Sequence, residues 1–128
     1  MSKKILIIDD EASVVELIKI ILEEENYHII TAFDGDEGLA KIESERPDLI
    51  ILDIVMPRVD GYSVLIAMKE FMKIKDRFPS MIPVIVLTAC VDSKVEKLIR
   101  NEGIAGYLEK PVKIEELLNS IRVALKET

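Results

Sequence analysis

The sequence is poor in several residue types, and each scarcity narrows what the protein can be. Cys90 is the single cysteine, so no disulfide forms within the chain, and one thiol suits a reducing compartment. His28 is the single histidine and has no cluster of metal-binding residue types around it, so we expect it to serve packing. The 17 basic residues are outnumbered by 24 acidic ones, and the net charge of -7 disfavours nucleic acid and anionic membranes as partners.

Long apolar runs are also missing. No run approaches the ~20 residues of a membrane-spanning helix. Only four apolar residues separate the start of the chain from Asp9, which is too few for a signal peptide. We therefore expect a cytoplasmic protein, monomeric by default. A length of 128 residues with 49% hydrophobic residues suits one compact domain with a substantial core, which we expect to span residues 1–128.

Five short apolar runs alternate with five stretches of helical periodicity. The predicted strands are residues 4–9, 27–32, 48–53, 83–88 and 104–108. The predicted helices are residues 12–25, 36–44, 61–75, 92–102 and 113–126, and Gly103 is expected to be left-handed after the fourth. Several runs are rich in Ile and Val, as is typical of strands buried on both faces. The alternation predicts an α/β fold, a five-stranded parallel sheet doubly wound with five helices.

Carboxylates follow two of the predicted strands. Asp9 and Asp10 end the first strand, and Asp53 ends the third. The carboxyl ends of parallel strands meet at one edge, and like charges gathered there cost stability unless a cation or a reaction requires them. Hard oxygen ligands at this density suit Mg2+. Asp10 could also cap the helix that follows it.

Two further groups would reach the same edge. The fourth strand ends at Thr88, and Lys110 follows the fifth. A metal ion, a hydroxyl and an ammonium around a carboxylate form a plausible phosphoryl-transfer site, with Asp53 as the nucleophile.

At this point the chain resembles, over essentially its whole length, the receiver domain of two-component response regulators, of the stand-alone, chemotaxis-regulator type. The matching residues, in family order, are Asp9-Asp10, Asp53, Met56-Pro57, Asp60-Gly61, Thr88-Ala89, Tyr107 and Lys110-Pro111. The resemblance implies a flavodoxin-like sheet of strand order 2-1-3-4-5. That order reverses between the first and third strands, where ligands bind in open parallel sheets.

The resemblance also implies roles for single residues. Asp53 would accept a phosphoryl group from a sensor histidine kinase or a histidine phosphotransfer protein. Mg2+ would be bound by the side chains of Asp10 and Asp53 and by the backbone carbonyl of Val55, with Asp9 acting mainly through a coordinated water. Lys110 would pair with the phosphoryl oxygens and form a cis peptide bond with Pro111.

Switching is implied as well. Thr88 would move toward the phosphoryl group and Tyr107 would follow it inward, coupling the site to the surface of the fourth helix, fifth strand and fifth helix. Val55 and Cys90 would flank the approach to the phosphoryl group. Because neither offers an amide or carboxylate to orient a water, we expect modest autodephosphorylation. A redox role for Cys90 would need a positive environment, for which Lys110 is the obvious candidate.

The first predicted helix has an unusually wide apolar face. Its apolar residues span an arc of roughly 160°, against ~100° for an ordinary core face, and Ile20 falls outside even that arc. We expect Val15 and Ile20 to stay exposed, either to dock a kinase or to contact the fifth helix.

The sequence therefore predicts two-component phosphorelay signalling. We expect a protein that catalyses only its own phosphorylation and autodephosphorylation and then controls a downstream protein target. No output domain is expected after residue 128. One alternative is a pseudo-receiver that binds partners without phosphorylation, although such proteins typically lose one of the acidic residues or the lysine. A remote one is a haloacid dehalogenase-type phosphatase, which would need Asp-x-Asp where this chain has Asp9-Asp10-Glu11.

Overall fold

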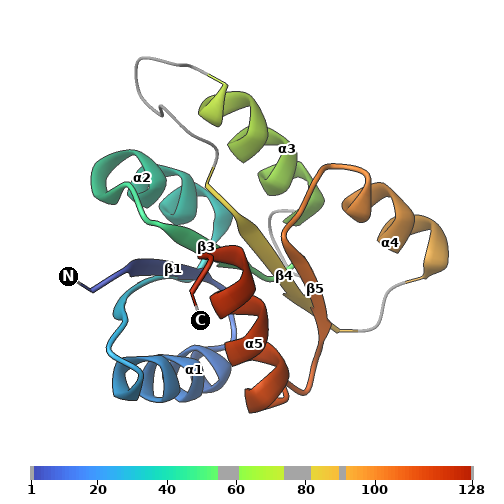
Figure 1. Ribbon diagram of the computed structural model, residues 1–128. Coiled ribbons are helices and arrows are strands. Elements are labelled where there is room, and N and C mark those ends of the chain that lie inside the picture. The colour runs from blue at the N-terminus through green and yellow to red at the C-terminus, as the bar shows by residue number, and fades with distance from the viewer. Residues whose placement is uncertain (1, 55–60, 74–81, 90–91, 128) are drawn as a thin grey trace.

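A computed structural model describes residues 2–54, 61–73, 82–89 and 92–127. Within these ranges ten elements alternate and form one five-stranded parallel sheet between two layers of helices (Figure 1). The strands are β1 (Lys4–Ile8), β2 (His28–Ala32), β3 (Leu49–Leu52), β4 (Val84–Thr88) and β5 (Gly106–Glu109). The helices are α1 (Ala12–Glu24), α2 (Gly35–Glu45), α3 (Gly61–Met72), α4 (Ser93–Arg100) and α5 (Ile114–Ala124). The predicted fold class and number of elements are confirmed.

The strand order is β2-β1-β3-β4-β5, with every pair parallel, as the resemblance implied. Ile8 at the end of β1 is level with Leu52 of β3, so the residues after them are neighbours as well. The backbone N–H of Asp53 donates to the carbonyl of Ile8 over 2.9 Å, which extends the ladder by one step. The register of β1 and β3 thus places Asp9 beside Asp53.

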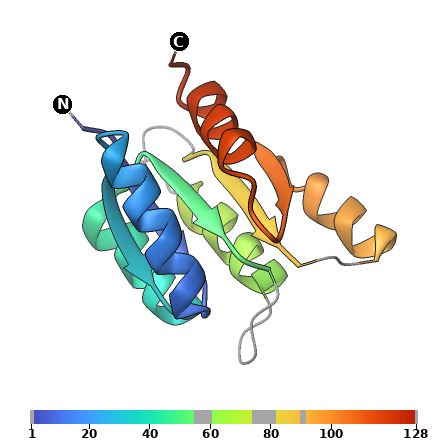
Figure 2. The same ribbon diagram turned by 90° about the horizontal axis from the view of Figure 1, so that it is seen from below.

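Side chains alternate between the two faces of the sheet and divide the core in two. Ile5 and Ile7 of β1 pack in one cluster with α1 and α5. Leu6 and Ile8 pack in the other with α2, α3 and α4. Figure 1 shows α1 and α5 below the sheet with α2 and α3 above it, and Figure 2 shows α1 and α5 in front of the strands. Burial on both faces explains why the strands read as unbroken apolar runs.

The boundaries match the prediction closely except at β5, which begins at Gly106 and not at residue 104. Helix α4 ends at Arg100, and Gly103 beyond it has a positive φ of 78°, which confirms its predicted left-handed conformation. Ile104 is therefore still part of the connection. Residues 74–81, between α3 and β4, lie outside the described residues.

The prediction for α1 was correct for Ile20 and wrong for Val15. Ile20 is 51% exposed, and so is Leu17. Val15 is only 2% exposed and belongs to the cluster that joins β1 and α5. The buried part of the apolar face packs in one cluster with residues of the sheet and of α5.

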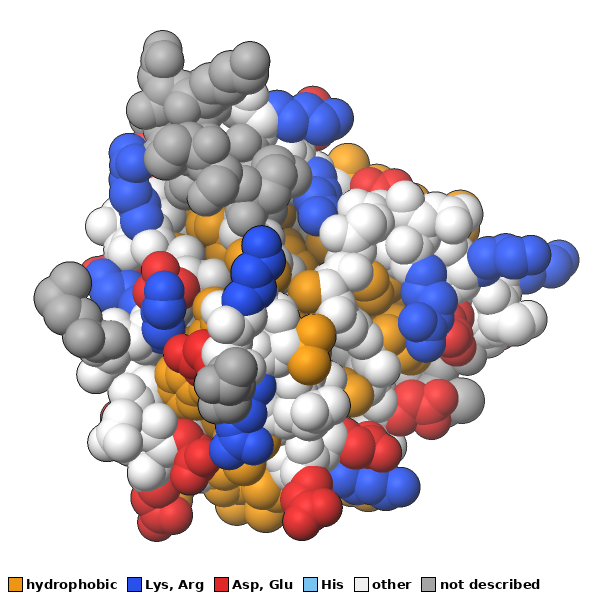
Figure 3. Space-filling view, in the orientation of Figure 1, with side chains coloured by type: hydrophobic (Ala, Val, Ile, Leu, Met, Phe, Trp, Pro, Cys, Tyr) orange, Lys and Arg blue, Asp and Glu red, His pale blue; other side chains and the backbone are white. Residues whose placement is uncertain are grey.

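The surface is mixed in charge. On the face drawn in Figure 3, acidic and basic side chains are interspersed with hydrophobic ones, so the negative net charge does not gather there in one patch. None of the helices in the described ranges is long and apolar enough to cross a membrane.

Candidate functional site

Three carboxylates converge at the carboxyl ends of β1 and β3. Asp9, Asp10 and Asp53 each offer an oxygen, and these oxygens all lie within 4.8 Å of one another. Asp9 and Asp53 are each 2% exposed, whereas Asp10 is more accessible. Three hard oxygen donors at this spacing fit a divalent cation such as Mg2+. The predicted convergence of these three residues is present in the fold.

The start of α1 fixes part of this arrangement. Asp9 Oδ1 accepts a hydrogen bond from the backbone N–H of Glu11 over 2.9 Å. Glu11 is the N-cap residue of α1, and no side chain caps the helix there. The alternative in which Asp10 caps the helix is therefore wrong, and its carboxylate is left for the cluster.

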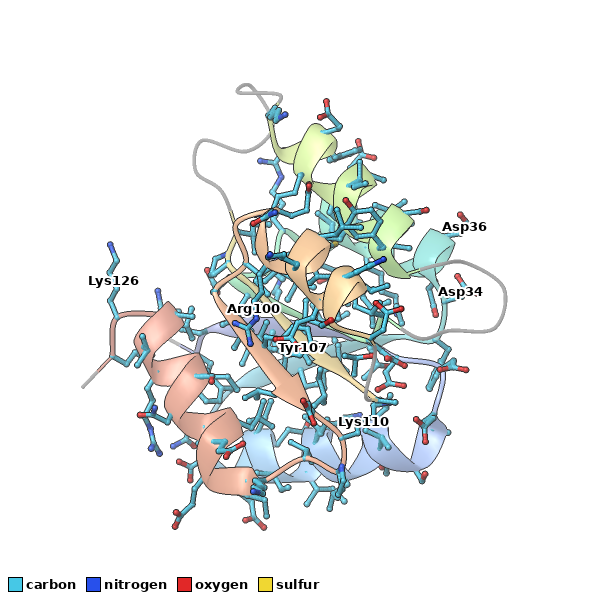
Figure 4. All side chains as sticks on the ribbon, turned by 90° about the vertical axis from the view of Figure 1, so that its right-hand side faces the viewer. Asp34, Asp36, Arg100, Tyr107, Lys110 and Lys126 are labelled. Carbon is cyan, nitrogen blue, oxygen red and sulfur yellow. The ribbon has the colours of Figure 1, made fainter. Side chains whose placement is uncertain are left out.

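Lys110 brings a positive charge to the carboxylates. Its Nζ lies 3.0 Å from Asp9 Oδ2, 3.3 Å from Asp53 Oδ2 and 2.6 Å from Glu11 Oε1. Its backbone N–H donates to the carbonyl of Thr88 over 2.8 Å, and the bond to Pro111 is cis, as the resemblance implied. Figure 4 shows Lys110 at the carboxyl end of β5.

The electrostatics of Lys110 are set by two opposing effects. Burial lowers the pKa of its ammonium, but hydrogen bonds to Glu11 and Asp9 and the charges of Asp9 and Asp53 outweigh burial, so the pKa is raised above its usual value. Lys110 is thus held in its charged form at neutral pH, as a partner for anionic oxygens must be.

Thr88 contributes an unpaired polar atom. It is the last residue of β4 and is fully buried, and its Oγ1 has no hydrogen-bond partner among the described residues. Leaving a buried hydroxyl unpaired costs about 1–3 kcal/mol. Because β4 lies next to β3, this hydroxyl is available on the same edge as Asp53. An oxygen-rich group bound at Asp53 would give it a partner.

Gly61 is part of the site through its backbone. Its N–H donates to the carbonyl of Ile54 over 3.0 Å. A Cβ atom at this position would lie 2.6 Å from the carbonyl oxygen of Asp53 and would also collide with Ile54. Only glycine therefore allows α3 to begin so close to the backbone of Asp53.

Tyr107 lies farther from the carboxylates, on β5. Its side chain is partly buried against the cluster shared with α3 and α4. The guanidinium carbon of Arg100 lies 4.7 Å from the centre of its ring (Figure 4), and Arg100 Nε also donates to Glu96 Oε2 over 2.8 Å. Tyr107 is thus held between the core and a cation of α4.

Two of the predicted site residues lie in parts of the chain that the structure does not describe, and one contact of Lys110 was not predicted. Val55 and Cys90 lie outside the described residues, as does most of the family pattern that follows Asp53. Their roles remain predictions. The contact of Glu11 with Lys110 was not predicted, although a third acidic residue directly after Asp9-Asp10 is a signal that could have suggested it.

This fold and this arrangement of carboxylates, hydroxyl and ammonium define the receiver class of signalling domains. The family model of the response regulator receiver domain matches residues 5–122, so the chain belongs to that family. Response regulators, the proteins that carry this domain, act in two-component phosphorelay signalling, and the kind of partner they work with is a histidine kinase.

Among curated relatives, the chain is 38% identical over 129 residues to the alkaline phosphatase synthesis transcriptional regulatory protein PhoP of Bacillus subtilis. It is 36% identical over 127 residues to the DNA-binding dual master transcriptional regulator RpaA of Synechocystis. These alignments cover 100% and 98% of this chain but 50% of each relative. The chain thus spans about half the length of the curated relatives it matches.

Solved structures agree along nearly their whole length. A CheY-like receiver domain protein from Methanospirillum hungatei is 32% identical with a TM-score of 0.84, covering 98% of this chain and 95% of that one. The chemotaxis protein CheY4 of Vibrio cholerae is 28% identical with a TM-score of 0.82, covering 97% and 99%.

The relatives leave one expectation without support. The net charge of the chain argued against nucleic acid as a partner, yet PhoP and RpaA are named as transcriptional regulators and RpaA as DNA-binding. Charge alone is therefore no ground for excluding nucleic acid.

Proposed function

We propose that Asp53 is the phospho-acceptor of this receiver domain, and that a sensor histidine kinase or a histidine phosphotransfer protein is its donor. The observation that carries the proposal is the pairing of a buried carboxylate with a half-buried ammonium, Asp53 Oδ2 with Lys110 Nζ at 3.3 Å. The unpaired hydroxyl of Thr88 on the neighbouring strand supports it.

The transfer is a displacement at phosphorus. An Asp53 carboxylate oxygen attacks the phosphorus atom and forms a P–O bond. The bond from phosphorus to the donor's histidine nitrogen breaks, and its electron pair stays on that nitrogen. Lys110 offsets the negative charge of the phosphoryl oxygens, and the Thr88 hydroxyl donates a hydrogen bond to one of them.

The acidic cluster suits Mg2+. Asp10 and Asp53 would hold the ion through their side chains, Val55 through its carbonyl, and Asp9 mainly through a coordinated water. When bound, the ion supplies positive charge that neutralises the phosphoryl oxygens. Asp10 is the most accessible of the three carboxylates, so it gives the ion a way in from solvent.

The output would pass through Thr88 and Tyr107 to the surface of α4, β5 and α5, where a downstream protein binds. Phosphorylation need only bias a two-state equilibrium by a few kcal/mol to change that protein's affinity. Ile20 and Leu17, both half exposed on α1, are candidates for the surface that docks the donor. Val15 is buried and is no longer one.

Two further expectations belong to this proposal. Catalysis by the chain is confined to its own phosphorylation and autodephosphorylation, the latter modest because of Val55 and Cys90. A phosphorylation-independent interaction module is the alternative, and nothing in the site or among the relatives favours it.

The test is the intact mass of the protein after incubation with acetyl phosphate, with and without Mg2+. The wild type should gain one phosphoryl group only with Mg2+, and Asp53→Asn should gain none. Asp36→Asn, an exposed change of the same kind on α2, should behave as the wild type. A phosphoryl group on the Asp53→Asn protein would contradict the assignment.

A further inference from the structure

Three carboxylates surround the Lys110 ammonium in the unmodified protein. An ammonium group has three N–H donors. Lys110 Nζ is close to three carboxylates, at 2.6 Å from Glu11, 3.0 Å from Asp9 and 3.3 Å from Asp53. The shortest contact is made by Glu11, which is the one of the three outside the acidic cluster.

The three contacts differ in how easily they can be given up. Asp9 and Asp53 are buried directly after strands β1 and β3. The Glu11 side chain is 55% exposed, so its carboxylate can turn away from Lys110 into water, where it is hydrated. Its backbone stays in place meanwhile, because the Glu11 N–H is bonded to Asp9 and its carbonyl accepts from Val15 over 3.0 Å.

A phosphoryl group on Asp53 would create a competition for Lys110. The group brings negative charge and new acceptor oxygens next to an ammonium that is already close to three carboxylates. It would also be repelled by the carboxylate of Glu11. The acyl phosphate no longer carries the carboxylate charge of Asp53, so the contact that Lys110 makes with Asp53 passes to the phosphoryl oxygens. Of the two carboxylates that still hold Lys110, Glu11 is the one that can leave by rotation of a side chain alone, and it competes with the phosphoryl group for the ammonium. A pocket of ≈ 450 Å³ that both Glu11 and Lys110 line leaves space beside the pair.

We propose that Glu11 is a positioning residue that holds Lys110 in the unmodified protein and competes with the phosphoryl group for it. The proposal rests on the assignment of Asp53 as phospho-acceptor and adds a regulator of that site. Glu11 sets how readily Lys110 is available, and so how fast the domain is phosphorylated.

The test compares initial rates of phosphorylation by acetyl phosphate at a fixed, saturating Mg2+ concentration. Glu11→Gln removes the charge and keeps the size of the side chain, and the rate should rise about two- to fivefold, as expected for loss of one partly exposed ion pair. Glu16→Gln removes the same charge from an exposed position of α1 and should leave the rate unchanged. Glu11→Asp keeps the charge but shortens the reach by one methylene, so it should also be faster if the contact itself matters.

A second readout separates competition from structural support. Binding of beryllofluoride, a phosphoryl mimic, in the presence of Mg2+ can be measured by calorimetry without any chemical step. Glu11→Gln should tighten this binding by a similar factor, whereas loss of a merely structural contact would weaken it. If the wild type is phosphorylated and Glu11→Gln is no faster and binds no tighter, the role of Glu11 is overturned. If the wild type itself takes no phosphoryl group, the function proposed for Asp53 fails, and this inference fails with it.

Discussion

Arg100 of α4 covers the ring of Tyr107 on β5, with its guanidinium carbon 4.7 Å from the ring centre. A cation over an aromatic face at a partly exposed site contributes about 0.5–1 kcal/mol. If Tyr107 turns inward on phosphorylation, as in the receiver family, it must leave this cation. The stacking therefore favours the unphosphorylated arrangement.

Removing the cation should shift that balance. In Arg100→Gln, the population with Tyr107 inward should rise about two- to fivefold before any phosphoryl donor is added. NMR shifts of the Tyr107 ring would report this as a movement toward the shifts of the phosphorylated wild type. Arg122→Gln, an exposed change on α5 that does not involve Tyr107, is the control. Identical ring shifts in Arg100→Gln and wild type would mean that Arg100 does not restrain the switch.

Mg2+ should stabilise the folded protein, because the carboxylates of Asp9, Asp10 and Asp53 converge only in the fold. At an Mg2+ concentration tenfold above its Kd, the free energy of unfolding should rise by about 1.4 kcal/mol. Thermal melts with MgCl2 and with NaCl at equal ionic strength would measure the specific part. Asp10→Asn should lose most of the gain, and a Tm that stays flat up to tens of millimolar Mg2+ would speak against the metal site.

Thr88→Val replaces a buried, unpaired hydroxyl with a methyl group of nearly the same shape. Because no hydrogen bond to a described residue is lost, the free energy of unfolding should rise by about 1 kcal/mol while the switch fails. Urea denaturation gives the stability, and intact mass confirms that Asp53 still receives a phosphoryl group. The same change at Thr31, which is partly exposed, should have little effect. A destabilised Thr88→Val would show that the hydroxyl has a stabilising partner.

Gly61→Ala should distort the backbone that carries Asp53. The added methyl would meet the carbonyl oxygen of Asp53 at 2.6 Å, and the obstacle is main chain that cannot rotate away. We expect a loss of about 2 kcal/mol or more of unfolding free energy, with slower phosphorylation. In Gly106→Ala the new methyl would be 3.6 Å from Ile85, an ordinary contact, so this variant should be close to neutral. Equal losses in urea denaturation for the two variants would rule out the collision.

Tyr27 makes stability depend on alkaline pH. Burial, and then its 2.7 Å hydrogen bond to Glu127, raise the pKa of Tyr27 to about 12 from the ordinary value of 10.0. The folded state thus holds this proton more tightly than the unfolded state. The corresponding stability is fully present below pH 10 and is lost as the pH rises toward 12. Denaturation at several pH values should show this loss in the wild type and not in Tyr27→Phe; a loss that persists in Tyr27→Phe would assign it to another group.

Much of this fold could be predicted because each strand is buried on both faces. That burial makes β1, β3 and β4 continuous apolar runs. The first polar residue at the end of each run, Asp9, Asp53 or Thr88, is a residue of the site. The order of the strands came from the family resemblance. Periodicity says which residues form a strand but not which strand lies beside it.

The failures arise where the outcome depends on a neighbour that is distant in sequence. A helical wheel measures how wide an apolar face is, but Val15 is buried in a cluster that includes residues of α5, about a hundred residues later. The same holds for Glu11, whose partner Lys110 is 99 positions away. Such contacts between residues distant in sequence form only in the folded molecule, so a local sequence pattern hardly predicts them.

The sheet also separates the surface of α1 from the surface of α4. Helix α1 packs on one face and α4 on the other, and the two apolar clusters beneath them are separated by the strands. A protein seated on the exposed side chains of α1 would leave α4 uncovered. A phosphoryl donor that binds only α1 and a downstream protein that binds only α4 could therefore occupy the same molecule at once. The downstream protein would not have to wait for the donor to dissociate.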